Sequence, residues 1–100
     1  MARHRELKVE SIICFESTSH AIMAEQELRE RDFHVRVMPK PSAIEAGCGF
    51  CLRFLPKDLE DALKFLSDAG IIIKEIYSME KTDGRVSYSK SALQPLRGER

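Results

Sequence analysis

The residues with the clearest capacity for chemistry lie in the stretch KPSAIEAGCGFC, which spans residues 40–51. Cys48 stands there between Gly47 and Gly49. Flanking glycines leave a cysteine sulfur sterically open and let another molecule approach the backbone. Loops that rigid elements position are frequent sites of function. We therefore interpret Cys48 as a candidate reactive thiol.

A cysteine reacts as the thiolate, so the sequence should supply groups that stabilise the anion. Lys40 and Arg53 are the candidate cations, and the backbone amides of residues 47–49 are candidates if they form an anion-binding nest. Ser42 precedes Glu45 at the spacing of a capping box, which predicts one helical turn over residues 43–46. Cys48 would follow the negative end of that turn, an opposing effect of only about a few tenths of a kcal/mol. We expect the cations to prevail.

Cys48 and Cys51 also form a C-x-x-C pair, which opens thiol–disulfide redox chemistry as an alternative. Because residues three apart in a strand point to opposite faces, a disulfide between them would need a sharp bend at Gly49. As a zinc site the pair is incomplete, because zinc takes four ligands and only His34 and Cys14 remain as spare donors. The sequence therefore predicts no metal and no cofactor.

Composition limits the class of protein. The chain has 100 residues, enough for one domain with one core, and its 16 basic residues balance 16 acidic ones. This balance argues against nucleic acid or an anionic membrane as the main partner. The apolar run SIICF after the basic N-terminus is too short for a signal peptide or a membrane span. Three cysteines, an odd number, argue against a disulfide framework. We expect a cytoplasmic protein.

The elements that must position Cys48 follow from hydrophobic periodicity. The clearest is a helix over residues 58–70, with an apolar stripe from Leu59 to Leu66 and Gly70 as its C-terminal cap. The full prediction is four strands and two helices: strands at 7–15, 33–38, 50–54 and 71–77, helices at 17–32 and 58–70.

This order predicts an α+β, ferredoxin-like βαββαβ sandwich, a four-stranded antiparallel sheet with both helices on one face. The domain should span residues 7–78, and the aperiodic residues 79–100 should form a loosely ordered tail. The other sheet face should then be bare. We expect another copy of the chain to cover it, giving a homo-oligomer. Its predicted members are Ile12, Cys14, His34, Arg36, Met38, Cys51 and Arg53.

Three segments resemble the small family of selenium/sulfur carrier-like proteins over roughly residues 10–78. They are FESTSHAIMAEQEL, then VRVMPKP, then GCGFCLRF. The resemblance implies that the working residue is the cysteine of the Cys-Gly pair, which falls on Cys48. Two features depart from the family pattern: the additional thiol of Cys51, and the extension beyond Met79.

Taken this way, Cys48 would accept sulfur or selenium from a donor enzyme as a persulfide or selenosulfide and pass it to an acceptor protein. A carrier needs an exposed thiol and a docking face, and we find no convincing general base, so a carrier is favoured over a turnover enzyme. Two alternatives stay open. One is a redox protein that uses Cys48 and Cys51, and the other is a non-catalytic module that binds a ligand or its own copy.

Overall fold

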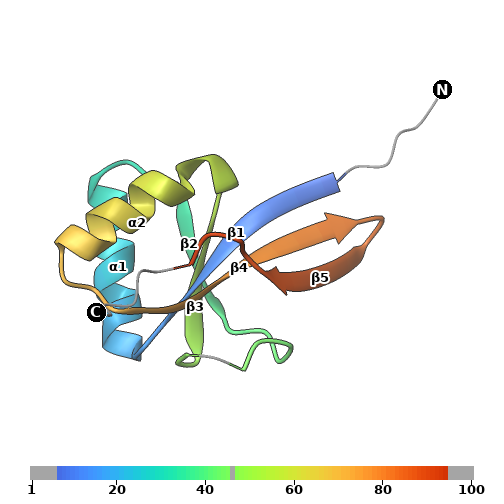
Figure 1. The fold of residues 1–100 in the computed structure, drawn as a ribbon, viewed down its shortest axis with the longest axis horizontal. Coiled ribbons are helices and arrows are strands. Elements are labelled where there is room, and N and C mark those ends of the chain that lie inside the picture. Colours follow the sequence, from blue (N-terminus) through green and yellow to red (C-terminus); the bar gives the residue numbers. More distant parts are fainter. Residues whose placement is uncertain (1–6, 46, 95–100) are drawn as a thin grey trace.

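The computed structural model describes residues 7–45 and 47–94 as a mixed α+β structure with a five-stranded antiparallel sheet and two α-helices (Figure 1). The strands lie in the order β2-β3-β1-β4-β5. In chain order the elements are β1 (Leu7–Phe15), α1 (Thr18–Glu30), β2 (Val35–Pro39), β3 (Phe50–Phe54), the 3₁₀ turn η1 (Pro56–Asp58), α2 (Leu59–Asp68), β4 (Ile73–Thr82) and β5 (Arg85–Lys90). Within the described ranges, neither helix is long and apolar enough to cross a membrane.

Local signals set the helix ends. Ser17 is the N-cap of α1, and its hydroxyl accepts a hydrogen bond from the backbone N–H of His20 at 3.3 Å. Gly70 ends α2 with φ at +76°, and the next amide, that of Ile71, reaches back to the carbonyl of Leu66 at 3.0 Å. This is the Schellman arrangement, which glycine favours because it has no Cβ. The predicted cap at Gly70 is therefore confirmed.

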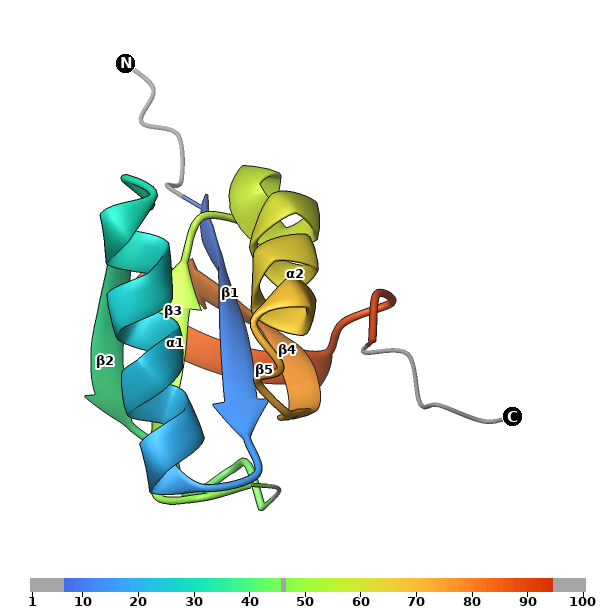
Figure 2. The same cartoon turned by 90° about the vertical axis from the view of Figure 1, so that its left-hand side faces the viewer.

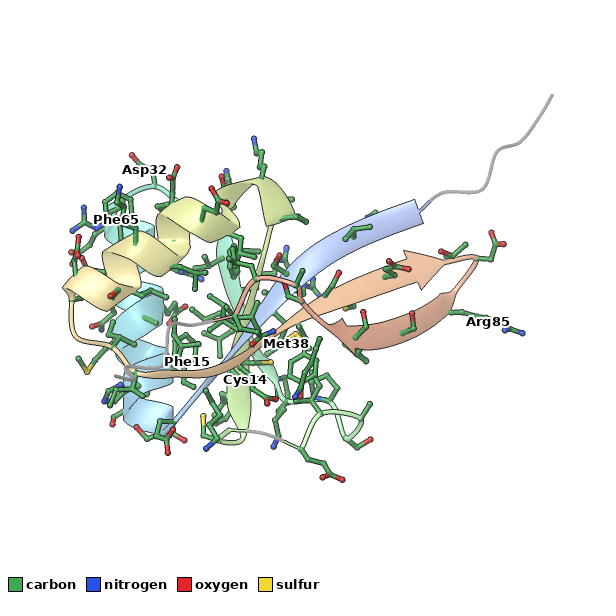
Figure 3. The ribbon with its side chains drawn as sticks, viewed as in Figure 1. Cys14, Phe15, Asp32, Met38, Phe65 and Arg85 are labelled. Carbon is green, nitrogen blue, oxygen red and sulfur yellow. The ribbon has the colours of Figure 1, made fainter. Side chains whose placement is uncertain are left out.

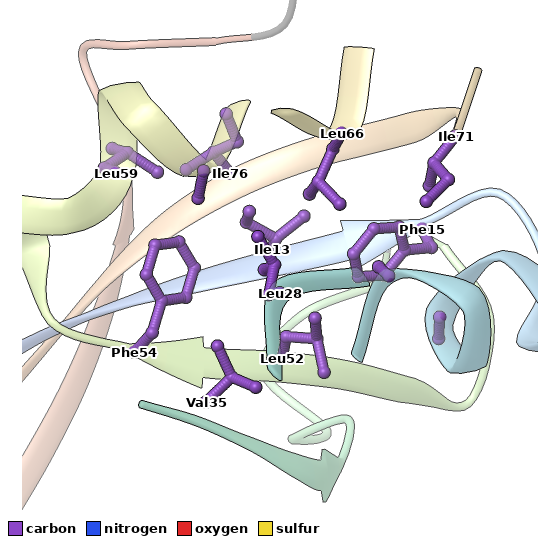
Figure 4. Packing of buried hydrophobic residues seen from close by; sticks show 13 residues of the cluster. Ile13, Phe15, Leu28, Val35, Leu52, Phe54, Leu59, Leu66, Ile71 and Ile76 are labelled. Atoms are coloured by element: carbon purple, nitrogen blue, oxygen red, sulfur yellow. The ribbon is translucent and has the colours of Figure 1, made fainter. Parts of the chain in front are cut away.

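Both helices cover the same face of the sheet (Figure 2). Figure 4 shows how side chains from the helices and strands interdigitate in the core between the layers. The predicted alternation of the strands holds here, since Ile13, Leu52 and Phe54 all point into this core. Its buried members are Ile13, Phe15, Ala21, Ala24, Leu28, Val35, Leu52, Phe54, Leu59, Ala62, Leu66, Ile71 and Ile76.

The expectation of four strands is wrong, because regular structure continues beyond residue 78. β4 runs to Thr82, and β5 pairs with it from Arg85 to Lys90. Asp83 and Gly84 connect the two strands, with φ values of +52° and +81°. Positive φ at both central residues is the requirement of a two-residue type I′ hairpin, and Asp-Gly satisfies it. The resulting hairpin extends away from the helices (Figure 1).

After β5 ends, the chain stays at the same edge of β4. The amide of Ser91 donates to the carbonyl of Ile76 at 2.9 Å. The side-chain amide of Gln94 donates to that same carbonyl at 2.7 Å and accepts from the N–H of Ile76 at 3.0 Å. The sheet therefore continues to Lys90, and Ser91 and Gln94 are hydrogen-bonded to β4, where the sequence predicted a loose tail. The remaining tail residues, 95–100, lie outside the described part of the chain.

The sheet face opposite the helices is not bare, which corrects the second expectation about the fold. Ile12, Cys14 and Cys51 are fully buried within the chain itself. They form a second, smaller core with Ile44 from the loop before β3 and Met79 from β4. Met38, Tyr77 and Tyr88 pack against it. The apolar surface from which we predicted a homo-oligomer is thus largely covered by the chain's own loop and strands.

Candidate functional site

The loop that carries Cys48 is docked on the end of β1. The backbone N–H of Cys48 donates to the carbonyl of Phe15 at 3.0 Å, although the two residues lie 33 positions apart in the sequence. On the other side of the loop, the N–H of Lys40 donates to the carbonyl of Gly49 at 2.9 Å. Backbone contacts on both sides therefore fix the position of Cys48 relative to the sheet.

Gly47 allows this close approach. Its φ is +86°, a left-handed conformation that residues with a side chain rarely adopt. A Cβ at this position would lie 2.9 Å from the carbonyl oxygen of Phe15 and 3.1 Å from the Cβ of Cys14. At Gly49, in contrast, a Cβ would meet nothing within 4 Å. Of the two glycines that flank Cys48, only Gly47 is therefore required by the packing.

The side chain of Lys40 links the start of the loop to its later residues through hydrogen bonds. Its ammonium nitrogen lies 3.2 Å from the carbonyl oxygen of Glu45 and 3.5 Å from that of Gly47. The ammonium group of Lys40 thus contacts carbonyl groups of its own loop, and its stabilisation of the Cys48 thiolate stays a prediction. Lys40 acts here as a clamp that holds the loop together.

The conformation before Gly47 differs from the predicted helical turn. A single turn closes where the N–H of Ile44 donates to the carbonyl of Pro41 at 3.0 Å. Ile44 and Glu45 have no helical assignment, and Ala46 lies outside the described residues. The turn aims Ile44 into the smaller core, where only 2% of its surface remains exposed. One buried side chain thus anchors the loop on the face opposite the helices.

The thiol of Cys48 is half-buried, and its Sγ donates to the carbonyl oxygen of Phe50 at 3.2 Å. Arg53, the other predicted cation, is not brought to this site. β3 carries it away from the loop, by roughly 10 Å between Phe50 and Arg53. There it forms an ion pair with Glu10, with 2.7 Å between Arg53 Nε and Glu10 Oε1.

Cys51 faces away from Cys48 and meets a different partner. It is the direct cross-strand neighbour of Cys14 in the β1–β3 pairing, and both side chains are completely buried. Figure 3 shows Cys14 on the central strand, near Met38. A hydrogen bond between the two thiols lowers the pKa of Cys14 and, with burial, raises that of Cys51. The thiol pair in this structure is Cys14–Cys51, a pairing that the sequence pattern did not reveal.

Burial predicts the order in which the thiols react. Cys48 should be alkylated first by a limiting amount of iodoacetamide near neutral pH, because it is the most accessible of the three. Cys14 and Cys51 should be labelled only after denaturant is added, because each has no exposed surface. Peptide mapping of the labelled protein measures this order. Labelling of Cys51 as fast as Cys48 without denaturant would contradict the placement of Cys51.

Comparison with known proteins shows to which family this chain belongs. No curated protein and no solved structure matches the chain. The sequence model of the family described as "Putative Se/S carrier protein-like" matches residues 10–78, which include most of β1, both helices, β2, β3, the Cys48 loop and the first part of β4. Because the match covers more than half of the chain, it establishes the relationship that the Cys-Gly motif suggested. The chain belongs to the Se/S carrier protein-like family.

Proposed function

We propose that the protein carries sulfur or selenium on Cys48, receiving the atom from a donor enzyme and delivering it to an acceptor protein. The observation that carries this proposal is the contrast among the three thiols. Cys14 and Cys51 are sealed in the smaller core, whereas Cys48 reaches the surface on a loop that backbone contacts hold in place. Membership of the Se/S carrier protein-like family points in the same direction.

In the sulfur-transfer step, the Cys48 thiolate attacks the terminal sulfur of a persulfide on the donor enzyme. The sulfur–sulfur bond of the donor breaks and a new one forms on Cys48. The donor cysteine leaves as a thiolate and takes up the proton that Cys48 gave up, so the exchange involves no net oxidation. The same exchange in reverse, with the acceptor protein as attacking thiol, unloads the carrier.

The scaffold suits such a role. We assign β1 to β4 with the two helices to the ferredoxin-like arrangement, and treat the β5 hairpin as an addition to it. The loop between β2 and β3 presents Cys48 at one end of the sheet, where a partner protein has access from outside. In a transfer between two protein thiols, each partner supplies half of the reacting pair, so the carrier itself needs no deep substrate pocket.

The redox alternative requires Cys51 to reach Cys48, and the structure gives no support for this. Cys51 lies in β3, directly opposite Cys14 and on the face away from the helices. Cys48 packs instead against the core on the helix side. The carrier proposal is therefore favoured over a Cys48–Cys51 dithiol.

Intact-mass measurement after incubation with a cysteine desulfurase and cysteine tests the proposal. A carrier should gain the mass of one sulfur atom, and a reducing agent should remove it. A loss of two hydrogens would indicate a dithiol redox protein instead. An unchanged mass, with a desulfurase shown to be active on another acceptor, would favour a non-catalytic binding module.

A further inference from the structure

The smaller core holds two thiols that the proposed sulfur transfer does not use. Cys14 on β1 and Cys51 on β3 are direct cross-strand neighbours, and neither has exposed surface. Both are free thiols in this structure. A single buried thiol behaves as a small apolar group, whereas two adjacent thiols can be oxidised together.

Backbone hydrogen bonds show which kind of cross-strand pair the two cysteines form. In an antiparallel sheet, the backbone N–H and C=O of successive residues point alternately to one neighbouring strand and the other. The amide of Lys40 donates to the carbonyl of Gly49, so the carbonyl of Gly49 points toward the β2 side. Two residues further along β3, the N–H and C=O of Cys51 point the same way, which is away from β1.

The other flank of the sheet gives the same result for Cys14. Gln94 bonds to the N–H and the C=O of Ile76, so these groups point away from β1. Ile13 faces Ile76, so its own backbone groups point to β3, and those of Cys14, the next residue, point to β4. Cys14 and Cys51 therefore form a non-hydrogen-bonded pair, the kind in which the Cα atoms are about 4.5 Å apart and the side chains are closest.

This separation suits a disulfide, which requires about 4.4–6.8 Å between the two Cα atoms. The thiols already contact each other, because the hydrogen bond from Cys51 lowers the pKa of Cys14. A lower pKa also makes Cys14 the thiol that reacts first with an oxidant. A bond between the two sulfurs therefore needs no change in the register of the strands.

Burial favours a disulfide over other modifications of these thiols. The side chains of Ile12, Ile44 and Met79 pack around the pair. Alkylation would place new atoms in this packed core, which costs free energy. Disulfide formation removes two hydrogen atoms and adds none, so the oxidised pair takes up no more space than the two thiols do.

We propose that Cys14 and Cys51 are a site of reversible oxidation, at which hydrogen peroxide converts the two thiols to a cross-strand disulfide within the folded chain. The Cys14 thiolate attacks one peroxide oxygen, the oxygen–oxygen bond breaks, and the other oxygen leaves as water, taking up the thiol proton. The sulfur of Cys51 then displaces the hydroxyl group from the sulfenic acid, and a second water leaves with the proton of Cys51. The two cysteines together lose two electrons and two protons, which the peroxide gains.

The oxidant needs a path to the pair, and the loop between β2 and β3 supplies it. Ile44 packs on the pair from this loop, whose described residues belong to no helix or strand. Local opening of such a segment needs less free energy than global unfolding. Hydrogen peroxide is small and uncharged, so a brief opening at Ile44 admits it.

Oxidation of the Cys48→Ser variant tests the site, because only the two buried cysteines remain in it. After treatment with hydrogen peroxide and its removal, iodoacetamide is added in denaturant. The monomer should take up no label, and peptide mapping should find the peptides of Cys14 and Cys51 joined. Dithiothreitol before labelling should restore two labels. Two labels without dithiothreitol, or sulfinic acid in place of the joined peptides, would overturn the proposal.

The unmodified protein should form the same link under the same treatment. A link between Cys48 and Cys51 in its place would contradict the pairing that the register assigns. The site does not depend on the proposed carrier function, since its test needs neither Cys48 nor a sulfur donor. Failure of either proposal therefore leaves the other standing.

The rate of disulfide formation tests the path. Ile44→Ala removes the side chain that packs on the pair from the loop, so oxidation should become several-fold faster. Ile71→Ala is the matched control, because it makes the same change at a buried isoleucine of the larger core, on the helix side of the sheet (Figure 4). Equal acceleration by both substitutions would show that oxidation proceeds through global unfolding, and the site within the folded chain would be wrong.

Discussion

Substitution of Cys48 by serine should abolish sulfur loading completely. A serine hydroxyl cannot form a persulfide, and the other two thiols are completely buried, so neither can take over the reaction. The fold should persist, because Cys48 is only half-buried and its structural contact to Phe15 is made by the backbone N–H. Intact mass after incubation with a cysteine desulfurase and cysteine measures the loading, and circular dichroism checks the fold.

The matched control is Cys51→Ala. Alanine is preferable to serine here because position 51 is fully buried, and a buried hydroxyl costs more free energy than a weakly polar thiol. This variant should be loaded to nearly the same extent as the unmodified protein, with some loss of stability from the small cavity. If Cys51→Ala abolished loading as completely as Cys48→Ser, the single-thiol carrier would be wrong. A mechanism that uses both cysteines would then replace it.

The second large effect is expected at Gly47. Alanine there must adopt a φ near +86° and place its Cβ 2.9 Å from the carbonyl oxygen of Phe15. The left-handed conformation alone costs roughly 1–2 kcal/mol. Because the opposing atom belongs to the backbone of β1, relief of the clash must displace the loop. We expect the free energy of unfolding, measured in urea, to fall by about 2 kcal/mol or more.

Gly49→Ala makes the same chemical change two residues away, in open space. The free energy of unfolding should change by no more than about 0.5 kcal/mol. The alkylation rate of Cys48 separates the two variants further. It should rise in Gly47→Ala, where the loop leaves its dock on Phe15, and stay nearly constant in Gly49→Ala. Equal destabilisation by both variants would show that the close approach at Gly47 is not the cause.

Local rules were sufficient for much of this fold. The apolar stripe of α2 and the glycine after α2 both act within a few residues, so the sequence shows them directly. Strand alternation also placed Ile13, Leu52 and Phe54 on the helix side correctly. These features identify the α+β class and position the loop that bears Cys48.

Hydrophobic periodicity does not predict β5, although the sequence contains a turn signal for it. Asp83-Gly84 is a strong indicator of a two-residue hairpin. The strand after it, RVSYSK, alternates only weakly, because Val86 and Tyr88 are its two apolar or aromatic residues and the other four are polar. Five of its six residues are exposed, so burial places little constraint on its sequence and hydrophobic periodicity does not predict the strand. Turn chemistry was the more informative signal in this segment.

The partners of Cys51 and Arg53 could not be read from periodicity. Alternation tells which face a residue occupies, but the register between strands decides which side chain stands opposite. That register places Cys14 against Cys51 and Arg36 against Arg53. The cover over the second sheet face also depends on tertiary structure, because Ile44 reaches it through an irregular turn.

The contact between Gln94 and Ile76 has a consequence for self-association. A side-chain amide offers the same donor and acceptor as a peptide group, and Gln94 uses both on the main chain of Ile76. It therefore occupies the position that a peptide of a neighbouring molecule would take at this edge of β4. Unpaired strand edges are common starting points for aggregation. Gln94 thus blocks edge-to-edge pairing with another molecule at the part of β4 that β5 leaves unpaired.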